Sequence, residues 1–283
     1  MAEKLKQMHW KKILLVGGIL MVALVAGLCV QKPEGIEPTL LQPAEELKLS
    51  DFPEAFKDST LIIVGDNTSD IEMQAANEIA EYLENETGNK PLIKKYSEIS
   101  DEDKRNYNLI VVGTPKTNPF LKEVYALTNA TKVTEEFPGE GRGVLEILRN
   151  PWDEEKAMLL VEGSDKWGAR VGSLMIVEEN KKLTKERKFV DWVEYTGVEF
   201  PIDSEEEAIR YAKTDPGVRN FISAWTAKKG CRVISQVILH EPDEGLFGVG
   251  FGVRCFGEPV FDAGYEIRFK DNGEIVLSVY RSI

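Results

Sequence analysis

Side chains that commonly act in catalysis are scarce in this sequence. It contains two histidines, His9 and His240. His240 is followed by Glu241 and Pro242, so the segment is not the helical H-E-x-x-H site of a zinc enzyme, which needs a second histidine. The G-x-S-x-G nucleophile elbow and the G-x-x-x-x-G-K-[ST] phosphate loop are also missing. We therefore predict no catalytic residue, no cofactor and no metal site, and we expect the protein not to be an enzyme.

Two loops carry polar side chains where a ligand could bind. Thr60–Val64 and Asn108–Val112 read as short buried strands, and each is followed by a glycine and then by a predicted helix. In open α/β sheets, ligands bind where such strands end and helices begin. The candidate ligand residues in these loops are Asp66, Asn67, Thr114 and Asn118.

A third glycine-containing loop, Pro138–Gly143, resembles a phosphate loop in composition. It precedes a predicted strand, whereas a dinucleotide loop opens a helix. We interpret it as a flexible connection.

The charge of the chain is strongly negative. The formal net charge is -13, and four lysines against Glu3 give residues 1–30 a charge of +3, which leaves -16 for residues 31–283. A field of this sign repels nucleic acid, so we expect no nucleic-acid partner. Glutamine occurs only five times while glutamate and lysine are abundant, a bias typical of thermophiles.

The N-terminal segment predicts a membrane anchor. Ile13–Val30 contains no charged residue, and as a helix of about 27 Å it would nearly match a hydrocarbon core of about 30 Å. The positive-inside rule then places the N-terminus in the cytoplasm and the rest of the chain outside. The lysines that precede the segment are Lys4, Lys6, Lys11 and Lys12.

We favour a retained signal anchor over residues 1–30, in a single-pass protein of the cytoplasmic membrane with extracellular domains. The alternative is a cleaved signal peptide, with Val25-Ala26-Gly27 as its cleavage site. Residues 31–58 contain four prolines and are predicted to form a stalk.

Strands and helices alternate over residues 59–200, which predicts an α/β layered domain with a mostly parallel sheet. Ser69 is the expected N-cap of a helix that ends at Gly88. A helix is expected over Lys166–Val177 and a last strand near Phe189–Tyr195. Three N-x-[ST] sequons in this domain make Asn67, Asn85 and Asn129 candidate glycosylation acceptors.

Residues 201–283 predict a small α+β domain, with two helices and an antiparallel four-stranded meander. If the first hairpin turns at Asp243, residues whose numbers add to 486 face each other. This register pairs Leu239 with Phe247 and Cys231 with Cys255. The two cysteines could then form a disulfide outside the cytoplasm, or remain as two buried thiols.

The stretch from Leu61 to Gly172 resembles the surface-layer protein domain of archaea. The resemblance lies in the segments IVGDN (63–67), AANEIA (75–80), NLIVVGTP (108–115), Asn118-Pro119, Gly141-Arg142-Gly143, Asn150-Pro151-Trp152 and Val161-Glu162-Gly163. It implies a non-catalytic role in the cell envelope and carries no active-site residue with it.

These observations predict a surface-layer-associated glycoprotein that interacts with other envelope proteins. The alternative is an extracellular module that binds a solute, a metal or a polysaccharide at the strand-end loops.

Overall fold

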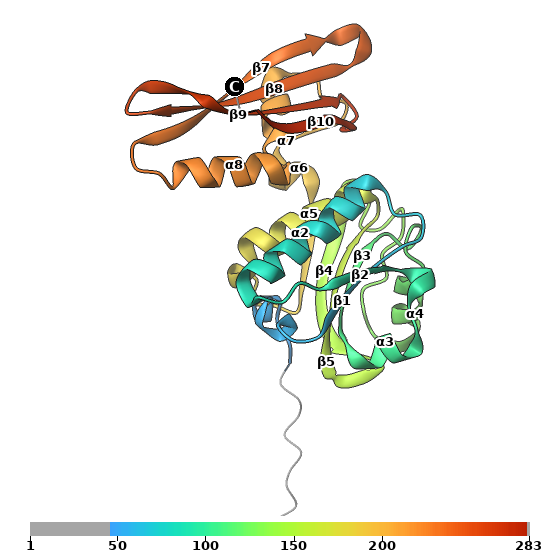
Figure 1. Ribbon diagram of the computed structural model, residues 1–283. Helices are drawn as coiled ribbons and strands as arrows, with labels where there is room; N and C mark the ends of the chain where they lie inside the picture. Colours follow the sequence, from blue (N-terminus) through green and yellow to red (C-terminus); the bar gives the residue numbers. More distant parts are fainter. Residues whose placement is uncertain (1–45, 282–283) are drawn as a thin grey trace, which may run out of the picture. The chain divides into compact units, whose positions relative to one another are not determined.

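The computed structural model describes residues 46–281, apart from the side chains of residues 261 and 262 (Figure 1). The predicted anchor over residues 1–30 lies outside the described residues, as does the first part of the predicted stalk. No helix within residues 46–281 is long and apolar enough to cross a membrane.

The first sheet has six strands in the order β2-β1-β3-β5-β4-β6. Strands β1, β2, β3 and β5 run parallel, whereas β4 and β6 run antiparallel to their neighbours. A mostly parallel sheet is therefore confirmed. The strands are β1 (Thr60–Val64), β2 (Leu92–Lys95), β3 (Asn108–Gly113), β4 (Arg142–Asn150), β5 (Asp153–Gly163) and β6 (Arg187–Asp191).

Helices cover both faces of this sheet (Figure 1). One face packs on α2 and α5, and the opposite face packs on α4. The predicted ends of α2 are confirmed, because the Ser69 hydroxyl accepts from the Glu72 N–H and Gly88 ends the helix with a φ of 76°. The helices of this part are α2 (Asp70–Thr87), α3 (Asp101–Asn106), α4 (Phe120–Leu127), α5 (Lys166–Glu179) and α6 (Trp192–Thr196).

The last strand of this part is shorter than predicted. It ends at Asp191, and Trp192–Thr196 forms the short helix α6. The Asp191 carboxylate caps this helix by accepting from the Glu194 N–H, a local signal that the strand prediction overlooked.

The C-terminal part of the predicted stalk is folded. Leu49, Phe52 and Phe56 are almost completely buried in the main hydrophobic cluster. These apolar side chains pack beside α2, and Pro53 lies in a short turn, so residues 46–58 are folded and do not form the predicted extended stalk. Within residues 46–281, the short 3₁₀ helices are Leu49–Asp51, Glu54–Phe56, Tyr96–Glu98, Asn180–Lys182 and Pro242–Glu244.

The second sheet is an antiparallel meander in the order β10-β9-β8-β7. Helices α7 (Glu205–Ala212) and α8 (Pro216–Thr226) pack against one of its faces (Figure 1). Its strands are β7 (Cys231–Glu241), β8 (Leu246–Cys255), β9 (Glu258–Lys270) and β10 (Ile275–Arg281). Apolar side chains of this sheet belong to the same hydrophobic cluster as α2 and α5, so the boundary predicted at residue 200 does not separate two cores.

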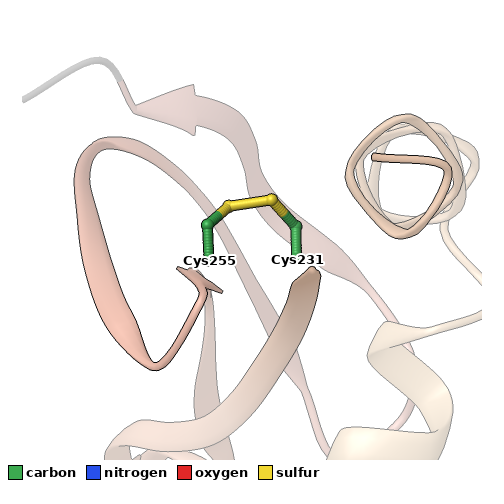
Figure 2. The surroundings of a disulfide bond; sticks show 2 residues. All are labelled: Cys231 and Cys255. Carbon is green, nitrogen blue, oxygen red and sulfur yellow. A yellow bond between two sulfur atoms is a disulfide. The ribbon is translucent and has the colours of Figure 1, made fainter. Parts of the chain in front are cut away.

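The predicted hairpin register holds over most of its length. Cys231 lies opposite Cys255, and their sulfur atoms form a disulfide (Figure 2). Near the turn the prediction is wrong, because a bulge after Val237 shifts the ladder by one residue. Leu239 therefore pairs with Gly248, and Phe247 pairs with His240.

Candidate functional site

A hollow of about 560 Å³ lies at the carboxyl ends of β1, β3 and β5. This is the edge of the sheet where the connections from β1 and β3 run in opposite directions, which is the usual ligand position in open α/β sheets. Its lining residues are Ser69, Glu72, Thr114, Lys116, Thr117, Glu135, Glu140, Ser164, Asp165, Lys166 and Trp167.

Two of the loops around the hollow touch through their backbones. A Cβ atom at Gly65 would lie 1.7 Å from the Thr117 carbonyl oxygen, so only glycine fits at the end of β1. The loop after β1 is therefore held directly against the loop after β3. This contact explains why the predicted strand ends in glycine.

The four candidate ligand residues lie in different surroundings. Thr114 lines the hollow, and its hydroxyl lies 3.0 Å from the hydroxyl of Thr117. Asp66 and Asn67 are exposed and do not line the hollow. The Asp66 carboxylate accepts from the Ser97 hydroxyl at 2.6 Å and from its N–H, and these bonds lower the pKa of Asp66.

Asn118 is a structural residue. Its side chain is fully buried, and its amide nitrogen donates to the carbonyl oxygens of Ile63 at 3.1 Å and Val112 at 3.0 Å. These bonds join the ends of β1 and β3. Every polar atom of the Asn118 side chain is used inside the protein, since its oxygen accepts from the Phe120 N–H.

Glu72 is the most buried charged residue of the hollow and is not among the ligand residues predicted from the sequence. Its side chain is fully buried. One oxygen accepts from the Ser69 N–H and hydroxyl, both at 2.8 Å, and the other accepts from the Thr117 hydroxyl. The spacing Ser69-x-x-Glu72 is a capping box, a signal that could have identified this glutamate.

Asp165 fixes the third loop. One oxygen caps α5 by accepting from the N–H groups of Trp167 and Gly168, and the other accepts from the Gly141 N–H at 2.8 Å. The Ser164 hydroxyl accepts from the Gly139 N–H at 3.0 Å. The Pro138–Gly143 loop is thus tied at two points, and its interpretation as a flexible connection is wrong.

The outward side chains of the hollow have mixed charge. Lys116 forms an exposed ion pair with Glu135, and the Lys166 ammonium lies over the Trp167 ring. Because Glu72, Asp165 and the hydroxyls bond within the protein, the hollow offers a ligand mainly these outward charges. Within residues 46–281, no cluster of three or more His, Cys, Asp or Glu residues could hold a metal ion.

A carboxyl group with strongly perturbed acidity lies elsewhere, beneath α4. Burial raises the pKa of Glu162 to about 8. One of its oxygens accepts from the Tyr125 hydroxyl, while the other has no partner among the described residues. Glu146 and Arg187, which form an ion pair, complete this buried cluster. Glu162 is fully buried and does not line the hollow, so it lies apart from the candidate ligand site.

The three sequon asparagines are accessible. Asn67 follows β1, Asn85 lies on the outer side of α2, and Asn129 follows α4; all three side chains are exposed. A glycan at any of them would extend into solvent.

No protein-family model matches this sequence, and no curated protein matches it significantly. The residues themselves therefore carry the functional argument.

Proposed function

We propose that this protein is a non-catalytic component of the cell envelope, held at the cytoplasmic membrane by its N-terminal segment, with residues 46–283 outside. The observation that carries this proposal is the Cys231–Cys255 disulfide. Disulfides persist in oxidising compartments and are rare in the cytosol, except in hyperthermophiles, so the proposed location rests equally on the apolar segment Ile13–Val30 and the lysines before it.

Two further features support this location. The three sequon asparagines are exposed, as glycan acceptors on an exported protein must be. Residues 61–172 resemble the archaeal surface-layer domain, and this likeness is part of the proposal. The protein would bind other envelope proteins or surface-layer subunits.

Topology is tested by protease digestion of intact cells that produce the full-length protein, followed by membrane fractionation. The proposal expects an epitope at the C-terminus to be lost on digestion, and the undigested full-length chain to remain with the membranes. A cytoplasmic protein in the same cells is the control for lysis. Protection of the epitope in intact cells would overturn the proposed location.

Thiol labelling tests the disulfide in the same cells. The sequence has three cysteines, Cys29, Cys231 and Cys255. After denaturation without a reductant, an alkylating reagent should label only Cys29; after reduction it should label all three. Labelling of all three before reduction would remove the main support for an oxidising compartment.

The second candidate function is binding of a polar solute or polysaccharide at the hollow. The hollow lies at the carboxyl ends of three parallel strands and has a volume of about 560 Å³, and both features favour ligand binding. Lys166→Ala would weaken binding of such a ligand while leaving the melting temperature nearly unchanged. A panel of sugars and salts in a thermal-shift assay, with Lys228→Ala as a remote control, tests it.

A further inference from the structure

Among residues 46–281, no helix covers one face of the four-stranded sheet. Helices α7 and α8 lie against the opposite face (Figure 1), where Phe251, Ile267 and Phe269 are buried. On the uncovered face, Ile234 and Ile238 of β7 remain 40% and 47% exposed. Large apolar side chains that stay exposed in a neighbouring pair are typical of interaction surfaces.

This uncovered face contains a groove of about 300 Å³. Its floor is formed by glycines, because Gly252 of β8 pairs with Gly264 of β9, and Gly250, two residues along β8, pairs with Glu266. Ile234 and Ile238 form a wall along the floor. Glycine weakens a strand, and several glycines side by side allow another chain to approach the sheet closely.

The charge of this face is opposite to that of the chain. Arg254 and Arg281 line the groove. Among the described side chains, Glu266 is the carboxylate that lines it. Arg232 lies directly opposite Arg254 in the β7–β8 ladder, and both side chains are exposed. Like charges opposite each other destabilise a sheet, so a binding partner that carries negative charge would relieve this repulsion.

Glu266 keeps part of this positive charge in position. It is only 5% exposed and forms ion pairs with Arg268 and Arg281. These bonds lower the pKa of Glu266, which therefore stays charged at neutral pH. Arg281 is thus oriented by a buried carboxylate, whereas no described side chain pairs with Arg254.

We propose that this face binds an acidic peptide segment of a partner protein, with an aliphatic side chain against Ile234 and Ile238 and a carboxylate beside Arg254. The aromatic residues of the groove, Phe251 and Tyr265, contribute no ring to the uncovered face: Phe251 is buried, and Tyr265 packs on Phe221 of α8. Aliphatic walls together with arginines fit a peptide that carries both apolar and acidic side chains. This assignment names the partner chemistry for the interaction role proposed above and rests on it.

The test uses the full-length protein in detergent micelles and a fluorescent peptide of alternating glutamate and valine. We expect saturable binding that weakens with salt, and no binding of the matched lysine–valine peptide. Arg254→Glu should weaken binding on the order of tenfold or more, because it places a like charge beside the peptide carboxylates. Gly250→Val, which fills the groove floor, should also weaken it.

The matched control is Arg105→Glu, which makes the same change of net charge on the exposed surface of α3. It should leave binding unchanged. Retention of the disulfide and of the melting temperature shows that each variant is folded. Equal binding of both peptides, or unchanged binding by Arg254→Glu, would overturn the proposal.

Self-association through this face that Arg254→Glu abolishes would also overturn it, because the occupant would then be a second copy of the chain. The binding assay does not depend on where the protein resides. Failure of this proposal is therefore distinguishable from failure of the topology experiment.

Discussion

Arg170 on α5 and Glu78 on α2 form a buried ion pair between the two helices that cover one face of the six-stranded sheet. Their side chains are 2% and 5% exposed. The Arg170 guanidinium also donates to the Thr214 carbonyl oxygen at 2.7 Å and to the Ser173 hydroxyl at 2.9 Å. Burial lowers the pKa of Arg170 to about 10, so the group remains charged at neutral pH.

Removal of Glu78 should strongly destabilise the protein. Glu78→Ala leaves Arg170 buried without its carboxylate, which typically costs about 3–5 kcal/mol in the free energy of unfolding. Urea unfolding of the purified protein measures this loss. Glu81→Ala, at an exposed position on the same helix, should change the free energy by less than about 0.5 kcal/mol.

The double variant Glu78→Leu with Arg170→Met provides a second comparison. It removes both charges of the pair, and Arg219, which also bonds to Glu78, stays paired with Glu178, so this variant should be more stable than Glu78→Ala alone. A Glu78→Ala protein as stable as the Glu81→Ala control would show that Arg170 gains solvent or another partner.

Asn118→Ala should destabilise the junction of β1 and β3. The change leaves the Ile63 and Val112 carbonyl oxygens without their side-chain donor, and the loss should be about 2–4 kcal/mol. Asn67→Ala, at an exposed site in the adjacent loop, is the matched control. Thermal unfolding of both variants separates a structural asparagine from a surface one, and an equal effect of the two changes would contradict the assignment.

Glu162 should make the protein less stable as the pH rises. Its folded pKa is about 8, while an unfolded glutamate has a pKa of about 4.3. Between these values the folded state retains a proton that the unfolded state has lost. The contribution of Glu162 to the free energy of unfolding is therefore fully present below about pH 4.3. As the pH rises towards 8, this contribution decreases by up to about 1.4 kcal/mol per pH unit.

Glu162→Gln should remove this dependence, because the amide is neutral at every pH. Glu155→Gln changes an exposed glutamate of the same strand and should leave the slope intact. Urea unfolding at a series of pH values between pH 5 and pH 8 gives the change in the free energy of unfolding with pH for each variant. Parallel slopes for Glu162→Gln and the original protein would show that Glu162 is ionised in the folded state.

Removal of the disulfide should destabilise the second sheet. Cys231 and Cys255 are 24 residues apart, and loss of a cross-link over a loop of this size typically costs about 3 kcal/mol. The double variant Cys231→Ser with Cys255→Ser should therefore melt at a lower temperature. Cys29→Ser should leave the melting temperature unchanged, and addition of a reductant should lower it only for the chain that retains both cysteines.

Local sequence patterns were sufficient for most elements of the fold. β-Branched runs that end in glycine predicted β1 and β3, and the cap at Ser69 predicted the start of α2. Alternating apolar residues around a turn predicted the Cys231–Cys255 pairing. These features depend on neighbouring residues and on periodicity, so one sequence suffices to read them. The bulge after Val237 was missed because an extra residue in one strand leaves no clear mark on that alternation.

Contacts between distant segments were decided only by the tertiary structure. The sequence placed Asp66, Asn67, Thr114 and Asn118 in strand-end loops, but packing of Gly65 on the Thr117 backbone buried Asn118 and left Asp66 outside the hollow. The arginines of the uncovered face could not be grouped from the sequence either, since they come from four different strands. The sequence by itself determined most of the strands, helices and caps, because those depend on local interactions. The tertiary structure decided which polar groups satisfy one another and which remain exposed to a partner, because burial depends on every segment that packs against them.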